Sequence, residues 1–214
     1  MIKVSKISKI YKDKSSEQVV FKNLSLNFDA STSYSIVGPS GSGKTTLLNL
    51  LSGLDSFDGG SINVNGAELY NAGPEAKSKL RKALFGFAYQ FHYLLENLTV
   101  FENCLASCFG NDSGAIKKIL KELEIVHIKD KFPSNISGGE KQRASIARAL
   151  AAKPKILILD EPTGNLDQSN SLIIQDFILN YAKKNKSLVI YATHDISFAE
   201  RADKMLKISD KGLV

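Results

Sequence analysis

Short segments in which apolar and polar residues alternate dominate the first third of the chain. VVFKNLSLNF alternates clearly, SYSIVG is short and apolar, and GGSINVNG is bounded by glycines. We predict a β-strand at each of these segments. TTLLNLLSGL carries leucines over a broad face and predicts a helix. A strand, a glycine-rich loop and a helix are therefore expected in that order from SYSIVG onward.

The middle of the chain, residues 92–152, has the periodicity of helices. One buried helical stripe is expected from Ile116, Ile119, Leu120 and Leu123. Ser113 precedes this stripe and is a candidate cap for the helix that carries it.

Two nearly continuous apolar runs, KILILD and SLVIYATH, follow the helical segment, and such runs are typical of strands covered on both faces. An amphipathic helix between them is indicated by Ile174, Phe177, Ile178 and Tyr181. Strands that alternate with helices predict an α/β fold built on a parallel sheet. We expect a single domain over 1–214, with a core and a small antiparallel β subdomain from 1–91 and 153–214, and a helical subdomain from 92–152.

The charge balance is basic, with 28 Lys and Arg against 22 Asp and Glu and a net charge of +6. This excess of positive charge favours binding to lipid headgroups, nucleic acid or nucleotide phosphates, and it does not discriminate among these three partners. No apolar run reaches the roughly 18 residues needed to cross a bilayer. The first residues, MIKVSKISKIYKDK, lack the apolar block of a signal peptide. We therefore expect a cytoplasmic protein.

The string GPSGSGKT fits the phosphate-binding pattern GxxxxGK(S/T) between a predicted strand and a predicted helix. Glycines allow backbone N–H groups to turn toward phosphates, and the helix N-terminus attracts negative charge. Lys44 can reach the β and γ phosphates, and the Thr45 hydroxyl can ligate Mg²⁺. Thr46 either caps the helix or binds the α phosphate. The alternative for the string is a plain glycine turn. The predicted phosphate cradle consists of Gly38, Pro39, Ser40, Gly41, Ser42, Gly43, Lys44 and Thr45.

The run ILILDEP predicts a buried strand that ends in two acidic residues. Asp160 at the strand tip can hold Mg²⁺ through water beside the cradle. Glu161 can orient or deprotonate a water that attacks the γ phosphate. The alternative is that both carboxylates are structural. Pro162 is expected to end the strand.

The stretch NISGGEKQRASIARAL begins with a capping box, because Glu140 follows Ser137 by three residues. A cap does not explain Gly138 and Gly139, since each glycine costs a helix about 1 kcal/mol relative to alanine. The glycines leave bare N–H groups at a helix N-terminus, which makes a second anion site. Two phosphate-binding elements imply either two nucleotides on one chain or one nucleotide shared between two chains.

ISGGEKQR resembles the signature motif of the ATP-binding-cassette (ABC) ATPases, usually written LSGGQ, with Ile136 and Glu140 as departures that are common in that family. The resemblance covers essentially the whole chain and implies a P-loop NTPase fold with a RecA-like core that binds ATP and Mg²⁺. It also implies that two chains bind head to tail as a homodimer, with Ser137, Gly138 and Gly139 of one chain on the γ phosphate held by the other. The further family elements are Tyr11 stacking on adenine, Gln90 as the Q-loop residue near Mg²⁺, Asp167 ending the D-loop motif GNLD, and His194 as the switch histidine.

Each of these further positions has a simpler interpretation. Tyr11 could pack against the N-terminal sheet, where Phe21 is nearby, and Gln90 could be a surface amide. His194 could be a structural histidine after its strand. His92 and His127 are interpreted as surface or packing residues.

Residues 85–103, FGFAYQFHYLLENLTVFEN, resemble the lipoprotein-release (LolD-type) cassettes, which implies lipoprotein release from the inner membrane. The alternatives within the same group are a MacB-type macrolide or peptide exporter and an FtsE-type cell-division cassette. The resemblance implies separate membrane permease subunits, which would hold the chain on the inner face of the cell membrane. Phe91 and the residues from Tyr93 to Leu95 are the expected docking surface, although some of them could be core. The part between Asn103 and the signature looks shorter than usual in the group. A soluble cassette acting on DNA or ribosomes is the least favoured alternative, and no nucleic-acid partner is expected.

Overall fold

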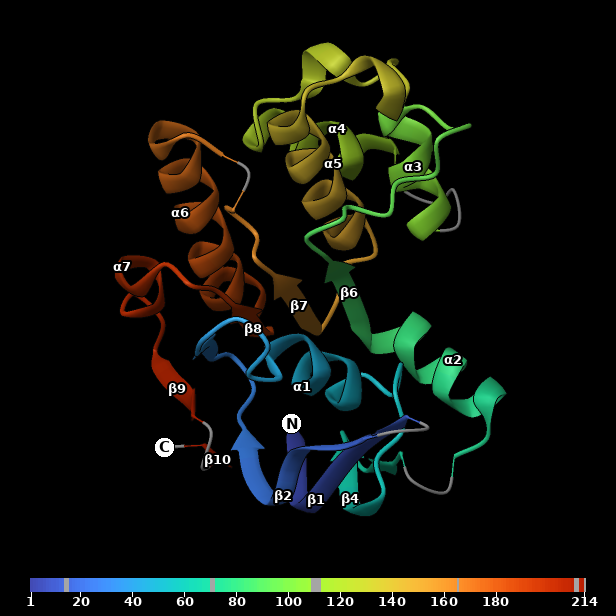
Figure 1. The fold of residues 1–214 in the computed structure, drawn as a ribbon. Coiled ribbons are helices and arrows are strands. Elements are labelled where there is room, and N and C mark those ends of the chain that lie inside the picture. Colours follow the sequence, from blue (N-terminus) through green and yellow to red (C-terminus); the bar gives the residue numbers. More distant parts are fainter. Residues whose placement is uncertain (14–15, 70–71, 109–112, 165, 210–211, 214) are drawn as a thin grey trace.

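The computed structural model describes residues 1–13, 16–69, 72–108, 113–164, 166–209 and 212–213, which form two β-sheets and the helices packed against them. Figure 1 shows the antiparallel sheet at one end of the molecule, a helical region at the opposite end, and the parallel sheet between them. The expected α/β fold with a parallel core, an antiparallel subdomain and a helical insertion is confirmed.

The antiparallel sheet has the strand order β2-β1-β4-β5. Apolar residues alternate with polar ones along its long strands because one face is buried. Register shifts interrupt the pairing of β1 with β2 between Val4 and Ile10, which bends this pair. Its strands are β1 (Ile2–Asp13), β2 (Ser16–Phe28), β4 (Gly59–Val64) and β5 (Ala67–Glu68).

The central sheet has the order β10-β9-β3-β8-β7-β6, in which β9, β3, β8, β7 and β6 run parallel and β10 pairs antiparallel with β9. Every residue of β3, β7 and β8 is buried, which explains the nearly continuous apolar runs of β7 and β8. The strands are β3 (Ser33–Val37), β6 (Phe85–Ala88), β7 (Ile156–Asp160), β8 (Leu188–Ala192), β9 (Lys204–Ser209) and β10 (Gly212–Leu213).

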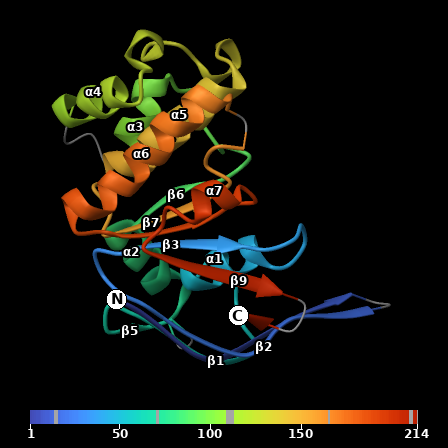
Figure 2. The ribbon, with the colours of Figure 1, turned by 90° about the vertical axis from the view of Figure 1, so that its left-hand side faces the viewer.

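The helices cover both faces of the central sheet (Figure 2). Helix α1 (Lys44–Leu51) lies between the two sheets, and α2 (Pro74–Leu84) leads into β6. The helical region between β6 and β7 contains α3 (Val100–Ser107), α4 (Ser113–Glu122), α5 (Gly138–Ala151) and the short 3₁₀ turns Val126–Ile128 and Pro133–Asn135. Helix α6 (Gln168–Asn185) joins β7 to β8, and α7 (Ile196–Ala199) follows β8.

The central sheet separates two hydrophobic cores. Ile156 and Ile158 of β7 belong to the core shared with α1 and the antiparallel sheet, whereas Leu157 and Leu159 belong to the core shared with the helical region. Successive side chains of a strand point to opposite faces, so each apolar strand serves both cores. Among the residues that the structure describes, no helix is both long and apolar enough to span a membrane.

One detail of the predicted helices was wrong. Ser113 is the first residue of α4 rather than the residue before it, and residue 112 lies outside the described part of the chain. The stripe itself is confirmed, with Ile116, Leu120 and Leu123 buried and Ile119 packed at its margin.

Candidate functional site

The cradle loop, residues 38–45, joins β3 to α1, so the predicted order of strand, loop and helix is confirmed. Gly41 and Gly43 have φ of 77° and 98°, a left-handed backbone that favours glycine. A Cβ on Gly38 would lie 2.7 Å from the backbone oxygen of Ile208. Lys44 begins α1, and its Nζ donates to the carbonyl of Gly38 at 2.8 Å. The loop therefore needs its glycines for conformation and for space.

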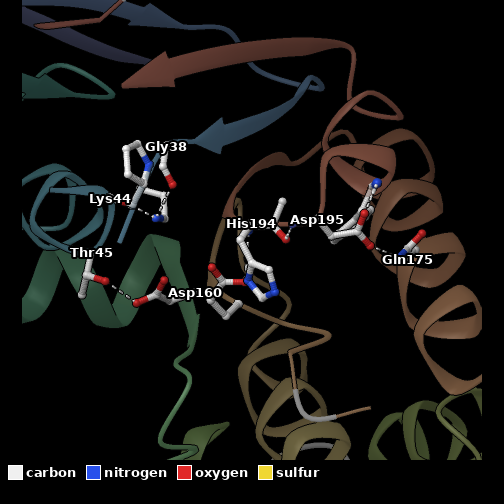
Figure 3. Close-up of polar contacts among 11 residues, drawn as sticks. Gly38, Lys44, Thr45, Asp160, Gln175, His194 and Asp195 are labelled. Carbon is white, nitrogen blue, oxygen red and sulfur yellow. Dashed lines mark hydrogen bonds and ion pairs between the residues drawn. The ribbon is translucent and has the colours of Figure 1, made fainter. Parts of the chain in front are cut away.

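An open cleft of about 510 Å³ lies beside the cradle loop and gathers many of the predicted residues, several of which Figure 3 draws. It is lined by Tyr11, Gln18, Val20, Ser40, Gly41, Gly43, Lys44, Thr45, Thr46, Gln90, Asp160, Glu161 and His194. Gly38, Pro39 and Ser42 belong to the loop without lining the cleft. Neither the signature residues 137–140 nor Asp167 is among the lining residues.

Thr45 and Asp160 both line the cleft and contact each other. The Thr45 hydroxyl donates to Oδ2 of Asp160 at 2.7 Å (Figure 3), although the two residues are far apart in sequence. Asp160 is the last residue of β7 and only 5% exposed. Burial raises the pKa of its carboxyl, against the opposing effect of the Thr45 hydrogen bond. Gln90 lines the same cleft. The side-chain oxygen atoms of Thr45, Asp160 and Gln90 are of the type that Mg²⁺ prefers as ligands.

Glu161 turns the chain immediately after β7, so the strand ends before Pro162. Its φ is 49°, an uncommon left-handed value for a residue with a side chain. The Glu161 N–H donates to the carbonyl of Ala192 at 2.9 Å, which ties this turn to the end of β8. The carboxylate is 2.9 Å from Nδ1 of His194 and also accepts the His194 backbone N–H at 3.3 Å. Because the Glu161 side chain is 12% exposed and that of His194 is 74% exposed, the histidine is the partner exposed to solvent.

Tyr11 is the aromatic residue that lines the cleft, and it is 42% exposed. Its hydroxyl donates to Oδ2 of Asp55 at 2.7 Å. Phe21, the nearby aromatic, is 3% exposed and belongs to the core. Only Tyr11 of these two therefore presents a ring to the cleft.

The capping box at the start of α5 is confirmed. The Glu140 carboxylate accepts the Ser137 N–H at 2.8 Å, and the Ser137 hydroxyl accepts the Glu140 N–H at 3.3 Å. The hydrogen bond from the Ser137 backbone holds the pKa of Glu140 below its usual value. A Cβ added to Gly138 would meet nothing within 4 Å, and its backbone is helical. Within the residues that the structure describes, nothing therefore requires glycine at this position.

The beginning of α5 lies away from the cleft. In Figure 1 this helix starts at the far end of the helical region and runs toward β6 and β7, while the cradle lies beside α1. Asp167 also lies elsewhere, as the cap of α6, where it accepts the Asn170 N–H at 3.0 Å. This hydrogen bond and one from Ser169 hold the pKa of Asp167 well below its usual range. Asn165 of the GNLD motif lies outside the described residues.

The expected docking segment after Gln90 is largely exposed, with Phe91 at 77%, Tyr93 at 63% and Leu95 at 48%. Leu94 instead packs against the helical core, so the alternative of core packing holds for this residue. His92 is half-buried and His127 is exposed, which agrees with their interpretation as surface or packing residues.

The backbone of the docking segment is held by α5. His92 and Tyr93 have φ of 62° and 48°, two left-handed residues in a row. The His92 carbonyl accepts from Ser145 and from Arg148, and the Tyr93 carbonyl accepts from Arg148.

Sequence reasoning missed Gln18 and Val20 of β2, which line the cleft. Gln18 pairs with Tyr11 across the β1–β2 hairpin, and Val20 closes over Gly43, where an added Cβ would lie 2.6 Å from Cγ1 of Val20. Pairing opposite Tyr11 is the signal that could have identified Gln18.

Known proteins similar to this chain agree with the geometry. The family described as ABC transporter matches residues 21–164. A lipoprotein-releasing system ATP-binding protein LolD of Pseudomonas fluorescens is 39% identical, over 97% of this chain and 94% of its own length. A LolD protein of Treponema denticola is 34% identical, over 97% of this chain and 95% of its own length.

A solved dimeric ATP-binding cassette, in a post-hydrolysis state bound to ADP and Pi, shares the fold with a TM-score of 0.93. It is 30% identical and covers 98% of this chain and 95% of its own chain. The cradle loop, the acidic end of β7 and the capped glycine helix thus occur in a chain whose relatives are ATP-binding cassettes along nearly their whole length. This chain belongs to the ABC transporter family, as one of its ATP-binding cassettes.

Proposed function

We propose that the chain binds MgATP in the cleft beside the cradle loop and hydrolyses it to ADP and phosphate. The observation that carries this proposal is that one cleft gathers Lys44, the Thr45–Asp160 pair and Glu161. Lys44 and the backbone N–H groups of the loop can bind phosphates, and the oxygen atoms of Thr45 and Asp160 can bind a metal ion. The Glu161 carboxylate beside them can activate water.

The chain's own residues divide the work within the cleft. Lys44 and the N–H groups of the cradle loop hold the phosphates, and Tyr11 stacks on adenine. Thr45, Asp160 and Gln90 hold Mg²⁺, which neutralises charge on the phosphate oxygens when bound. Glu161 orients the attacking water and accepts its proton, and His194, hydrogen-bonded to that carboxylate, lies where it can contact the γ phosphate.

A second copy of the chain completes each site in this proposal. Ser137, Gly138 and Gly139 present a helix N-terminus to the γ phosphate bound by the partner, and Glu140 supports them through the capping box. Support comes from the open surroundings of Gly138 and from the solved relative, which is a dimer. Asp167, at the exposed start of α6, is assigned to the same dimer interface.

The proposed physiological role is transport driven by this ATP-dependent pairing. The relatives named as components of a lipoprotein-releasing system support lipoprotein release as the process and a membrane permease as the partner. The exposed side chains of Phe91, Tyr93 and Leu95 offer that permease an apolar contact. The chain would then work in the cytoplasm, on the inner face of the membrane.

Replacing Glu161 by Gln tests the hydrolysis and the pairing together. Glu161→Gln keeps the shape of the side chain and removes its basicity, so we expect at least about a hundredfold loss of phosphate release. Because ATP still binds, the variant should run as a dimer on size exclusion with saturating MgATP. Glu200→Gln, at an exposed position after α7, is the matched control and should behave as wild type. A Glu161→Gln protein that hydrolyses normally, or stays monomeric with MgATP, contradicts the proposal.

A further inference from the structure

Lys9 is an unusual residue for its position, because a lysine ammonium is rarely buried unless it is paired. Lys9 lies on β1 and is 6% exposed. Its Nζ donates to Oδ1 of Asp55 at 2.9 Å and to the carbonyl of Ser56 at 2.7 Å. The ammonium group therefore has specific partners in the segment that follows α1.

The same ammonium group contacts Tyr11. Residues two apart on a strand share one face, and Nζ of Lys9 lies 4.4 Å from the centroid of the Tyr11 ring. This separation is within the range of a cation–π interaction. One face of the ring is thus covered by a cation, while the residue still lines the cleft.

Asp55 closes the cluster. Its Oδ1 accepts from Lys9 and from the Ser56 N–H at 2.7 Å, while its Oδ2 accepts the Tyr11 hydroxyl at 2.7 Å. Burial alone would raise the pKa of the Asp55 carboxyl, but the hydrogen bonds from Tyr11 and Lys9 outweigh it and lower the pKa. Asp55 therefore stays ionised and anchors both the cation and the phenol.

The anchor is attached to the end of the cradle helix. Asp55 follows α1 by four residues, and its N–H donates to the carbonyl of Asn49 within α1 at 3.3 Å. Asp58 adds a further tie, since its Oδ2 accepts the Ile10 N–H of β1 at 2.7 Å. The Tyr11 ring is therefore fixed relative to the helix that begins at Lys44.

We infer that Lys9 and Asp55 are positioning residues that hold the Tyr11 ring, with its uncovered face toward the cleft, ready to stack on the base of bound ATP. The inference rests on the proposed function, because it takes the cleft as the ATP site. A ring held at both its hydroxyl and one face loses little freedom when a base stacks on it, so base binding is strengthened.

The test compares MgATP with magnesium tripolyphosphate, which carries the phosphates without the base. Lys9→Met, Asp55→Asn and Tyr11→Phe are each titrated with both compounds by calorimetry. We expect each variant to bind ATP about three- to tenfold more weakly and tripolyphosphate as wild type does. In steady-state assays KM for ATP should rise by the same factor with kcat unchanged.

A matched control is available on the same strand. Lys12 forms an exposed ion pair with Glu17 at 3.0 Å, so Lys12→Met removes an equal charge without touching the cluster. It should bind both compounds as wild type does. Tyr11→Phe keeps the ring and removes only the hydroxyl from a partly exposed residue, so it remains informative if Lys9→Met or Asp55→Asn fails to fold.

Two results would overturn the inference. One is unchanged ATP affinity in Tyr11→Phe and in whichever cluster variants fold. The other is an equal loss of affinity for ATP and tripolyphosphate, which would indicate general damage to the cleft. A wild-type chain that binds neither compound would instead contradict the proposed function, so the two failures are distinguishable.

Discussion

Replacing Gly138 by alanine should make the isolated chain slightly more stable and much less active. The backbone of Gly138 is helical, and an added Cβ would have no neighbour within 4 Å. Alanine at a position with a compatible backbone lowers the conformational entropy of the unfolded chain. The free energy of unfolding should therefore rise by about 0.5 kcal/mol, in the lower part of the usual range. For a chain of this size that raises the melting temperature by about 1–2 °C.

The activity should change in the opposite direction. If the Gly138 N–H contacts a phosphate bound by a second chain, a methyl group at this helix N-terminus keeps the oxygen out of hydrogen-bonding range. Loss of one hydrogen bond to a charged group costs about 1.5–3 kcal/mol. The hydrolysis rate should therefore fall by roughly ten- to a hundredfold.

Thermal melts without nucleotide and steady-state phosphate release measure the two effects. Gly114, on α4, is the control, because an added Cβ there also meets nothing within 4 Å. Gly114→Ala should show the same gain in melting temperature with normal hydrolysis. If Gly138→Ala hydrolyses ATP like Gly114→Ala, the start of α5 does not face a nucleotide, and the proposed sharing of sites is refuted.

Two further predictions concern binding and acid stability. Lys44→Ala should weaken MgATP binding by about 2–3 kcal/mol, since it removes a charge-assisted phosphate contact; calorimetry showing wild-type affinity would remove Lys44 from the site. Asp203 accepts both the N–H and the hydroxyl of Ser33, which lowers the pKa of its carboxyl in the folded chain. A lowered folded pKa stabilises the protein above the unfolded pKa of about 4, and this contribution disappears as the pH falls through the folded value. In urea unfolding, Asp203→Asn should therefore be about 1 kcal/mol less stable than wild type at pH 7. This deficit should shrink steadily as the pH falls below about 4; a deficit that stays constant over that range would contradict the assignment.

Local patterns were enough to predict the strands that are buried on both faces and the helices that follow them. The short strand β6, Phe85–Ala88, was not predicted, because four residues are too few to show a period. The strand β9 was missed as well, since Ile208 is its only buried residue and the rest are half-buried or exposed. The order of the central sheet depends on crossover connections, which hydrophobic patterning does not encode.

The site was predictable where its chemistry is contiguous along the chain. Lys44 and Thr45 belong to the string GPSGSGKT, and Asp160 and Glu161 belong to the run ILILDEP. Each of these two parts of the site could therefore be recognised from its own local sequence. The hydrogen bond between Lys9 and Asp55 joins residues 46 positions apart. Neither a lysine nor an aspartate indicates, from the sequence alone, which residue will be its partner. Contacts of this kind depend on where two chain segments meet in the fold, which a single sequence does not show.

The separation of the α5 N-terminus from the cleft has a kinetic consequence. If each cleft is completed by another copy, turnover in dilute solution follows the population of pairs and rises with the square of the protein concentration. Once two copies are tethered to a common scaffold, the same chemistry becomes first order in that assembly. The scaffold would then accelerate the reaction through effective concentration alone, before it deforms or repositions a single residue.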